Sequence, residues 1–268
     1  MPPNPNAVGV LIPARFGSSR FPGKPLAQLA GRPLIQHAYE AATQVRDVSE
    51  VRVVTDDARI AHTVEQFGGQ VMMIDTPCRT GTDRVAKAAA QLDCSVIVNL
   101  QADEIPLHPS LLRDLIDPFL ASGQTMGTLK RQLSANDELQ DTALVKVVTD
   151  IHQNAIYFSR LPIPFVRDGQ AGDTSTLHYS HLGIYIFRRE TLLHFADLPT
   201  GTLEEAEKLE QLRALEHGIT IRVWETKHES LRIDRPEELK AAEAQFIRKT
   251  SQSASCPPSS AYTASTQQ

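Results

Sequence analysis

Residues 8–25 read VGVLIPARFGSSRFPGKP, an apolar run followed by a loop rich in glycine, proline and basic side chains. The run 8–13 is typical of a buried strand. A glycine-rich loop that follows a strand and ends in Gly-Lys is a common arrangement for binding phosphate. The stretch therefore predicts an α/β fold, and it raises the question of how this loop handles a phosphate group.

The rest of the N-terminal half alternates strands with helices. The expected strands are 51–56, 70–74 and 95–101, and the expected helices are 32–45, 60–67 and 82–92. Near-continuous apolar strands joined by helices indicate a Rossmann-like, mostly parallel sheet flanked by helices on both faces. Such sheets bind ligands beyond the carboxyl ends of their strands. The loops expected to carry a site are therefore 14–25, 56–57, 75–84 and 101–108.

The second half contains more strands and fewer helices. Strands are expected at 126–133, 143–150, 155–160 and 178–189, so that about 125–190 forms a mixed or antiparallel extension of the parallel sheet. A helix with leucines at three-residue spacing is expected at 203–217, then a strand at 219–225 and a last helix at 236–249. We expect one domain over 7–250. The tail 251–268, which has eight Ser or Thr and no charged residue, is expected to be disordered.

Composition excludes several classes of protein. A net charge of −5 and a hydrophobic content of 41% fit an ordinary globular protein and favour neither a nucleic-acid nor a membrane partner. The three cysteines have no metal-ligand spacing, which fits reduced thiols better than disulfides. No signal peptide or membrane span is recognisable. We therefore expect a soluble, cytoplasmic protein.

The opening loop is not a Walker A motif. That motif needs four residues between its glycines and a Ser or Thr after the lysine, whereas five residues separate Gly17 from Gly23 and Pro25 follows Lys24. The dinucleotide-binding glycine pattern is absent too. What remains is a proline-stiffened loop with Arg15, Arg20 and Lys24 at a predicted ligand edge. We favour phosphate binding over an ordinary solvated turn.

Several segments together resemble one known family. VLIPARFGSSRFPGKPLAQLAGRPLIQHAYE is similar to the N-terminal motif of the 3-deoxy-manno-octulosonate cytidylyltransferases, also called CMP-KDO synthetases. The family also matches, in order, VTDD (54–57), TGTDRVA (80–86), NLQADE (99–104), HLGIY (181–185), EKLEQLRAL (207–215) and IDRPEEL (233–239). The resemblance implies a fold of the nucleotide-diphospho-sugar transferase type. It also implies a homodimer, formed through the 125–190 segment.

The resemblance implies transfer of CMP from CTP to an acidic eight-carbon keto-sugar, with release of pyrophosphate, for lipopolysaccharide or capsule synthesis. Catalysis of this in-line attack is largely positioning and charge stabilisation. The matching positions that would contact the nucleotide are Arg15, Ser18, Lys24, Arg84 and Gln101. Lys24 and Arg15 would stabilise the phosphates during transfer. For Arg84, an ion pair with Asp83 is the alternative.

The same resemblance implies Mg²⁺ held by Asp103 and Asp234. Asp103 follows the predicted strand 95–101, as a magnesium-holding carboxylate should. Asp234 is equally well placed to cap the last helix, since Pro236 follows two residues later. Nothing in the sequence alone brings the two carboxylates together.

For the sugar, the family's contacts match Gln101, Arg160, His181, Tyr185, Glu210 and Gln211. Each of the last four also has a structural interpretation. His181 is a lone histidine, and such residues are more often structural than ligand-binding. Tyr185 alternates with Gly183 and Phe187 and is also typical of a core residue, while Glu210 and Gln211 fit the wet side of a leucine-faced helix.

The chain departs from the family in the acidic motif. The family usually reads Q-G-D-E-P, and this chain has QADEIP, with Ala102 in place of Gly and Ile105 in place of Pro. A methyl group at 102 would crowd the site if that backbone has positive φ or lies against the ligand. Two alternatives therefore stay open: a related acidic sugar such as an amino analogue, or a weakly active nucleotide-binding homologue.

Overall fold

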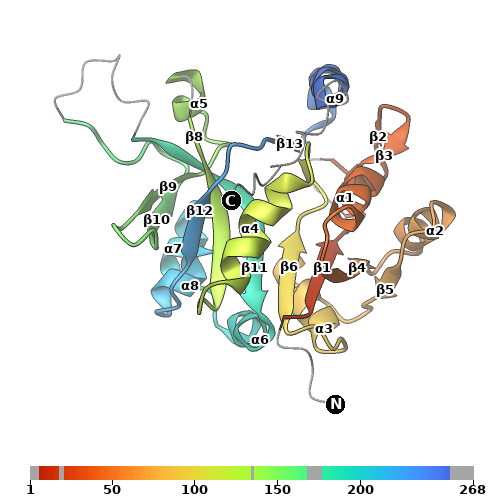
Figure 1. The fold of residues 1–268 in the computed structure, drawn as a ribbon, viewed down its shortest axis with the longest axis horizontal. Coiled ribbons are helices and arrows are strands. Elements are labelled where there is room, and N and C mark those ends of the chain that lie inside the picture. The colour runs from red at the N-terminus through yellow and green to blue at the C-terminus, as the bar shows by residue number, and fades with distance from the viewer. Residues whose placement is uncertain (1–5, 18–20, 134–135, 168–176, 254–268) are drawn as a thin grey trace, which may run out of the picture.

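A nine-stranded mixed sheet organises the computed structural model, which describes residues 6–17, 21–133, 136–167 and 177–253 (Figure 1). Its parallel part consists of four neighbouring strands in the order β6 (Val96–Leu100), β1 (Val8–Pro13), β4 (Val48–Thr55) and β5 (Val71–Met73). In register, Val10 of β1 lies between Val51 and Val98. The predicted Rossmann-like sheet is thereby confirmed.

The connections reverse direction beside β1. From β1 the chain proceeds to β4 and β5 through α1 (Leu34–Thr43) and α2 (Ala58–Gln66), and it returns through α3 (Gly81–Ala89) to β6 on the other side of β1. This arrangement creates a topological switch point between β1 and β6. Doubly wound sheets bind their ligands at such a point, at the carboxyl ends of the strands.

Both faces of the sheet are covered, because the side chains of each strand alternate between two apolar clusters. Val10 and Ile12 pack with residues of α1, α2 and α4 (Ser110–Leu120) on one face. Leu11 and Val54 pack with residues of α3, α6 (Arg189–Asp197) and α8 (Leu212–Glu216) on the other. The β1 residues are fully buried, which explains why the run is apolar throughout.

The extension is antiparallel and mixed, as predicted. The long strand β11 (Tyr179–Arg188) pairs antiparallel with β6 and with β8 (Met126–Gln132), and beyond it follow β9 (Lys146–Thr149) and β10 (Ala155–Ser159). β12 (Arg222–Glu225) adds to β8 in parallel. The short helix α5 (Asn136–Gln140) lies in the connection between β8 and β9.

Several elements were not predicted. They include α4, α6, the short pair β2 (Gln28–Leu29) and β3 (Arg32–Pro33), and the pair β7 (Glu104–Pro106) and β13 (Ser230–Arg232). Pro118 lies inside α4, close to its C-terminal end, where the proline removes one intrahelical hydrogen bond. From sequence alone, a proline indicates that a helix ends before it, whereas this helix continues to Leu120. The β7–β13 pair matters most, because it joins residues 104–106 to residues 230–232, which lie far away in the sequence.

The single helix predicted over 203–217 is wrong. The segment forms α7 (Thr202–Glu207) and α8, separated at Lys208, whose φ of 53° is left-handed. Arg160 holds this break, since its guanidinium donates to the carbonyl oxygens of Glu207, Lys208 and Thr142 at 3.0, 3.5 and 3.1 Å. The hydrogen bonds to Glu207 and Lys208 stabilise the break between the two helices, although the leucine spacing predicts one continuous helix.

The C-terminal region continues from β13 into the 3-10 turn η2 (Pro236–Glu238) and α9 (Leu239–Ser253). The helix therefore extends three residues into the segment predicted as a tail, and the remainder of that prediction, 254–268, lies outside the described residues. Within the part of the chain that the structure describes, no helix has both the length and the apolar character needed to cross a membrane.

Candidate active site

A cleft opens at the switch point, where β1 and β6 end. Its enclosed volume is about 160 Å³, and the cleft is open to solvent on one side. Three of the four loops predicted to carry a site contribute to its lining, which consists of Pro13, Ala14, Arg15, Lys24, Pro25, Cys78, Thr80, Gly81, Arg84, Gln101, Ala102 and Asp103. Asp56, from the remaining loop, pairs with one of the lining side chains, as described below.

Asp103 and Asp234 lie together at the edge of this cleft. The β7–β13 ladder pairs Glu104 with Arg232, and the amide of Ile233 donates to the carbonyl oxygen of Asp103 at 3.3 Å. Antiparallel pairing therefore places residue 234 next to residue 103. The 3-10 turn η2 begins after Arg235 rather than after Asp234, so the capping alternative for Asp234 is not what the structure shows.

The ammonium group of Lys24 bridges the two carboxylates. Nζ lies 2.5 Å from Asp103 Oδ2 and 3.3 Å from Asp234 Oδ1, and the Lys24 side chain is 14% exposed. The loop is shaped for this contact by Gly23, whose φ of 71° is left-handed and whose missing side chain would meet the Phe16 ring at 3.1 Å. Only glycine adopts that conformation at little cost. The sequence did not predict that Lys24 pairs with both acids.

The other predicted phosphate contacts differ in their surroundings. Arg15 is exposed on the cleft, and within the described ranges its guanidinium has no ion pair. Arg84 is buried, and it pairs with Asp56 at 2.5 Å and donates to the Ile74 carbonyl at 3.1 Å. The ion pair expected as an alternative is thus real, but its partner is Asp56 rather than Asp83. Ser18 lies outside the described residues.

Gln101 begins a chain of hydrogen bonds that runs away from the cleft. Its Nε2 donates to Asn99 Oδ1 at 2.8 Å, Asn99 Nδ2 donates to Thr82 Oγ1 at 3.0 Å, and Thr82 donates to Glu210 Oε2 at 2.9 Å. The direction of every bond follows, because an ionised carboxylate only accepts. Gln101 therefore offers its carbonyl oxygen as an acceptor within the cleft, close to Gly81.

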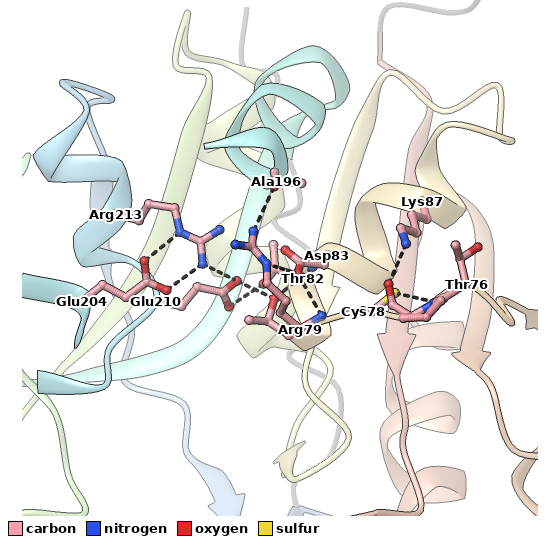
Figure 2. A network of polar contacts seen from close by, with 12 residues as sticks. Thr76, Cys78, Arg79, Thr82, Asp83, Lys87, Ala196, Glu204, Glu210 and Arg213 are labelled. Atoms are coloured by element: carbon pink, nitrogen blue, oxygen red, sulfur yellow. Dashed lines mark hydrogen bonds and ion pairs between the residues drawn. The ribbon is translucent and has the colours of Figure 1, made fainter. Parts of the chain in front are cut away.

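Glu210 is the anchor of a polar network between the 75–84 loop and the α7–α8 pair (Figure 2). Thr80, the N-cap of α3, also donates to Glu210, at 2.7 Å. Burial raises the pKa of Glu210, and these hydrogen bonds oppose the shift. Arg213, 1% exposed, lies 3.8 Å away and makes two bonds of 2.7 and 2.6 Å to Glu204. Glu210 is therefore not on the wet side of a helix.

A small recess with an enclosed volume of about 10 Å³ adjoins this network. Its lining includes Tyr185, Glu210 and Gln211, so three of the predicted sugar contacts do converge, together with Thr82, Met126, Phe187 and Phe195. Gln211 is buried. The Tyr185 ring lies 5.3 Å from that of His181 and 6.2 Å from that of Phe187, and burial raises its pKa.

His181 is a neutral ring. Burial, reinforced by the charge of Arg232, lowers the pKa of the ring to about 3. Its Nε2 lies 2.9 Å from Thr128 Oγ1, and the same hydroxyl lies 2.7 and 3.1 Å from the Ile184 and Leu182 carbonyl oxygens. A neutral imidazole has one donor nitrogen and one acceptor nitrogen, so His181 can exchange one hydrogen bond with Thr128.

The structure differs from two expectations, a sugar contact for Arg160 and backbone strain at Ala102. Arg160 lines neither the cleft nor the small recess and instead holds the α7–α8 break, so its contact with a sugar stays a prediction. Ala102 lines the cleft but is not among the residues with positive φ, so the strain considered for that methyl group is absent. Ile105 is fully buried against Leu231 and Ile233 in the apolar cluster beneath β7 and β13.

Asp103 and Asp234 are also the residues best suited to hold a metal ion. Both offer carboxylate oxygens, which Mg²⁺ prefers, and the ammonium group already between them shows that this position favours a cation. Within the described residues no group of three or more His, Cys, Asp and Glu side chains could hold a metal. Because Mg²⁺ typically uses one or two protein carboxylates and keeps waters and phosphate oxygens, the pair fits such an ion.

The fold and this site together define a nucleotidyltransferase, since a cationic loop and two carboxylates meet at the switch point of a mixed sheet. The profile of the family described as Cytidylyltransferase matches residues 9–221. The chain is 47% identical over 240 residues to 3-deoxy-manno-octulosonate cytidylyltransferase of Geobacter sulfurreducens (87% of this chain and 96% of that protein). It is 51% identical over 239 residues to that of Anaeromyxobacter sp. (88% and 96%). The chain belongs to the 3-deoxy-manno-octulosonate cytidylyltransferase family.

Solved structures agree with this assignment. A CMP:2-keto-3-deoxy-manno-octonic acid synthetase, solved in complex with CTP, superposes with a TM-score of 0.84 at 37% identity, covering 91% of this chain and 99% of that one. A putative glucose-1-phosphate thymidylyltransferase from Bacillus anthracis superposes with a TM-score of 0.63 at 16% identity, covering 90% and 95%. The second likeness concerns the fold alone.

Proposed function

We propose that this chain transfers CMP from CTP to 3-deoxy-manno-octulosonate, giving the CMP-sugar and pyrophosphate. One observation carries the proposal: Lys24, Asp103 and Asp234, which come from distant parts of the sequence, meet within 3.3 Å at the switch-point cleft. The family and the identity of its members supply the substrates. The product would serve lipopolysaccharide synthesis in the cytoplasm.

The nucleotide would lie in the cleft with its triphosphate against the loop after β1. Arg15 is exposed there and Lys24 lies opposite it, so both cations can approach phosphate oxygens. Charge grows on those oxygens as the anomeric hydroxyl attacks the α-phosphorus in line, and preorganised cations stabilise that charge. Arg84, already paired with Asp56, would contribute chiefly by holding the start of α3 in place.

Asp103 and Asp234 would hold Mg²⁺. When bound, the ion would neutralise phosphate charge and reduce the repulsion between two anionic substrates. The role of the chain itself is to keep these two carboxylates adjacent, which the β7–β13 ladder does. Lys24 would then be released from the carboxylates and become available to the phosphates.

The sugar would bind between the cleft and the small recess. Gln101 would offer its carbonyl oxygen to a sugar hydroxyl, the neutral ring of His181 would exchange a further hydrogen bond, and Tyr185 and Gln211 line the adjoining space. Glu210 would act through Thr80 and Thr82, whose hydroxyl groups already occupy its carboxylate. The predicted sugar contact of Glu210 would therefore be indirect.

A homodimer would form through the strand-rich extension. Apolar side chains gather there on the surface, including Ile151 and Phe165, which are 90% and 87% exposed, and Ile156, Leu161 and Leu177. Ile156 lies on β10, the last strand at one edge of the sheet, and Ile151 and Leu161 flank that strand in the sequence. A second copy would bury this surface, which monomeric proteins rarely expose.

The proposal is tested by measuring pyrophosphate release with each nucleoside triphosphate and a panel of acidic sugars, with and without Mg²⁺. We expect release with CTP and the octulosonate. Preference for an amino analogue would identify a related acidic sugar as the substrate. Binding of CTP without release for any sugar would indicate a weakly active nucleotide-binding homologue and contradict the proposal.

A further inference from the structure

The guanidinium of Arg232, on β13, lies beside the two acids of the active site. Nη2 pairs with Asp234 Oδ2 at 3.0 Å, and Nη1 donates to the Ala143 carbonyl at 3.2 Å. A guanidinium has five N–H donors, and these two contacts leave the others without a hydrogen bond among the described residues. The side chain is 36% exposed, so the remaining donors are accessible to a ligand.

The neighbours of Arg232 lead directly to the sugar side of the site. Arg232 faces Glu104 across the β7–β13 ladder, and Glu104 Oε2 lies 3.7 Å from where a side chain on Gly183 would begin. Gly183 lies between His181 and Tyr185 on one face of β11. The absence of a side chain at 183 lets Glu104 approach, and the charge of Arg232 reaches both His181 and Tyr185.

The chemistry of a 2-keto sugar acid favours a cation close to its anomeric carbon. Its carboxylate is bonded to the anomeric carbon, and the hydroxyl on that same carbon attacks the α-phosphorus. The carboxylate must therefore lie between the phosphate end of the cleft and the pocket for the sugar ring. Arg15 and Lys24 are assigned to phosphates in the proposed function. Arg232 is a further cation on this side of the site: it pairs with Asp234, and its charge acts on the rings of His181 and Tyr185.

We propose that Arg232 binds the carboxylate of the sugar acid and makes that carboxylate a requirement for binding. Guanidinium groups pair with carboxylates through two parallel hydrogen bonds, which fixes orientation as well as charge. Asp234 and the Ala143 carbonyl hold the side chain in advance, so little conformational freedom is lost when the sugar binds. This inference rests on the proposed function and assigns it a specificity residue.

A purely structural role for Arg232 makes a different prediction. If Arg232 only neutralises Asp234, its loss would change metal binding and the KM for CTP, and it would not alter the preference between an acid and a neutral sugar. The two roles are separable because the carboxylate can be removed from the sugar without changing the protein.

The experiment compares wild type with Arg232→Gln and Arg232→Lys, and with Arg113→Gln as a control that removes an exposed arginine of α4 paired with Asp117. Pyrophosphate release is measured with 3-deoxy-manno-octulosonate and with its C1 carboxamide. We expect Arg232→Gln to raise the KM for the acid roughly ten- to hundredfold, the usual effect of losing a charge-assisted hydrogen bond. The preference for acid over carboxamide should fall by a similar factor. Arg232→Lys should keep part of the preference for the acid. The control Arg113→Gln should behave like wild type in both measurements.

The KM for CTP and the thermal midpoint should stay close to wild type in Arg232→Gln. An unchanged preference for the acid in both variants would overturn the inference, as would a defect confined to CTP or Mg²⁺. Should Arg232→Gln fail to fold, the carboxamide preference of Arg232→Lys decides the question. Absence of release by the wild-type protein would instead refute the proposed function itself, and the inference with it.

Discussion

Lys24 Nζ lies 2.5 Å from Asp103 Oδ2, so an ion pair joins the loop after β1 to the loop after β6 across the cleft. Asp234 completes the contact from β13, at 3.3 Å. In this arrangement the lysine occupies the position that suits a metal ion. Nucleotide phosphates would attract the lysine while the ion takes its place, so the two ligands should assist each other's binding.

Replacing Lys24 with Met should therefore tighten metal binding by the free protein. The substitution leaves Asp103 and Asp234 without their counter-charge, and we expect about tenfold stronger binding of Mn²⁺ in the absence of CTP. Turnover should fall by about 10²- to 10³-fold, because a cation that stabilises the phosphates is lost. Titration calorimetry measures the binding. Lys87→Met, which removes an α3 lysine bonded to the Pro77 carbonyl, is the matched control, and weaker Mn²⁺ binding in Lys24→Met would contradict the idea.

Asp103→Asn should abolish turnover while the protein still folds. Loss of one of two metal-holding carboxylates is expected to lower kcat at least about a thousandfold. Asp103 is partly exposed and its side chain packs in no apolar cluster, so the thermal midpoint should change little. Asp117→Asn on the exposed side of α4 is the control. A near-normal rate would remove Asp103 from the metal site.

The neutral ring of His181 should make stability depend on pH. Its pKa is about 3 in the folded protein against an ordinary value of 6.5, so below pH 6.5 the unfolded chain binds a proton that the folded chain does not. Stability is therefore lost as the pH falls from 6.5 toward 3, by up to about 2 kcal/mol between pH 6.5 and pH 5. Urea unfolding at several pH values measures this slope. In His181→Gln the slope should flatten, and an unchanged slope would show that other groups cause it.

Glu210→Gln should weaken the link between the 75–84 loop and α8. Thr80 and Thr82 donate to different oxygens of Glu210, and a carboxamide replaces one of these oxygens with an NH₂ group that cannot accept. We expect a loss of about 1–3 kcal/mol in the free energy of unfolding and a higher KM for the sugar, because Gln101 loses its fixed orientation. Denaturant titration and steady-state kinetics measure the two effects. Glu205→Gln, on the exposed side of α7, should change neither.

Much of the fold was predictable because it depends on local patterns. The buried runs of β1, β4 and β6 and the apolar faces of α1 to α3 are visible in the order of residues alone, and they place the cleft at the ends of the strands. The helix 203–217 was not predictable in this way. Its leucine spacing is regular, yet the guanidinium of Arg160, a residue far away in the sequence, stabilises a break at Lys208.

The residues of the candidate site also fall into two groups, those that the sequence predicts and those that it does not. Arg15, Lys24 and Gln101 follow predicted strands, and the structure places all three on the cleft. Thr82 and Arg213 lie inside matched motifs and Arg232 lies next to one, but the sequence predicted a role for none of them, since a buried ion pair or a relay of hydrogen bonds has no sequence period.

The sequence by itself determined the parallel sheet, the cationic loop that is not a Walker motif, and the position of Asp103 after a predicted strand. Only the tertiary structure decided that Asp103 and Asp234 share one ammonium group and that Arg232 pairs with Asp234. The physical reason is the short β7–β13 ladder. Its few residues are stabilised by burial of Ile105, Leu231 and Ile233 against α9 and β2, and such long-range pairing leaves no periodic trace in the sequence.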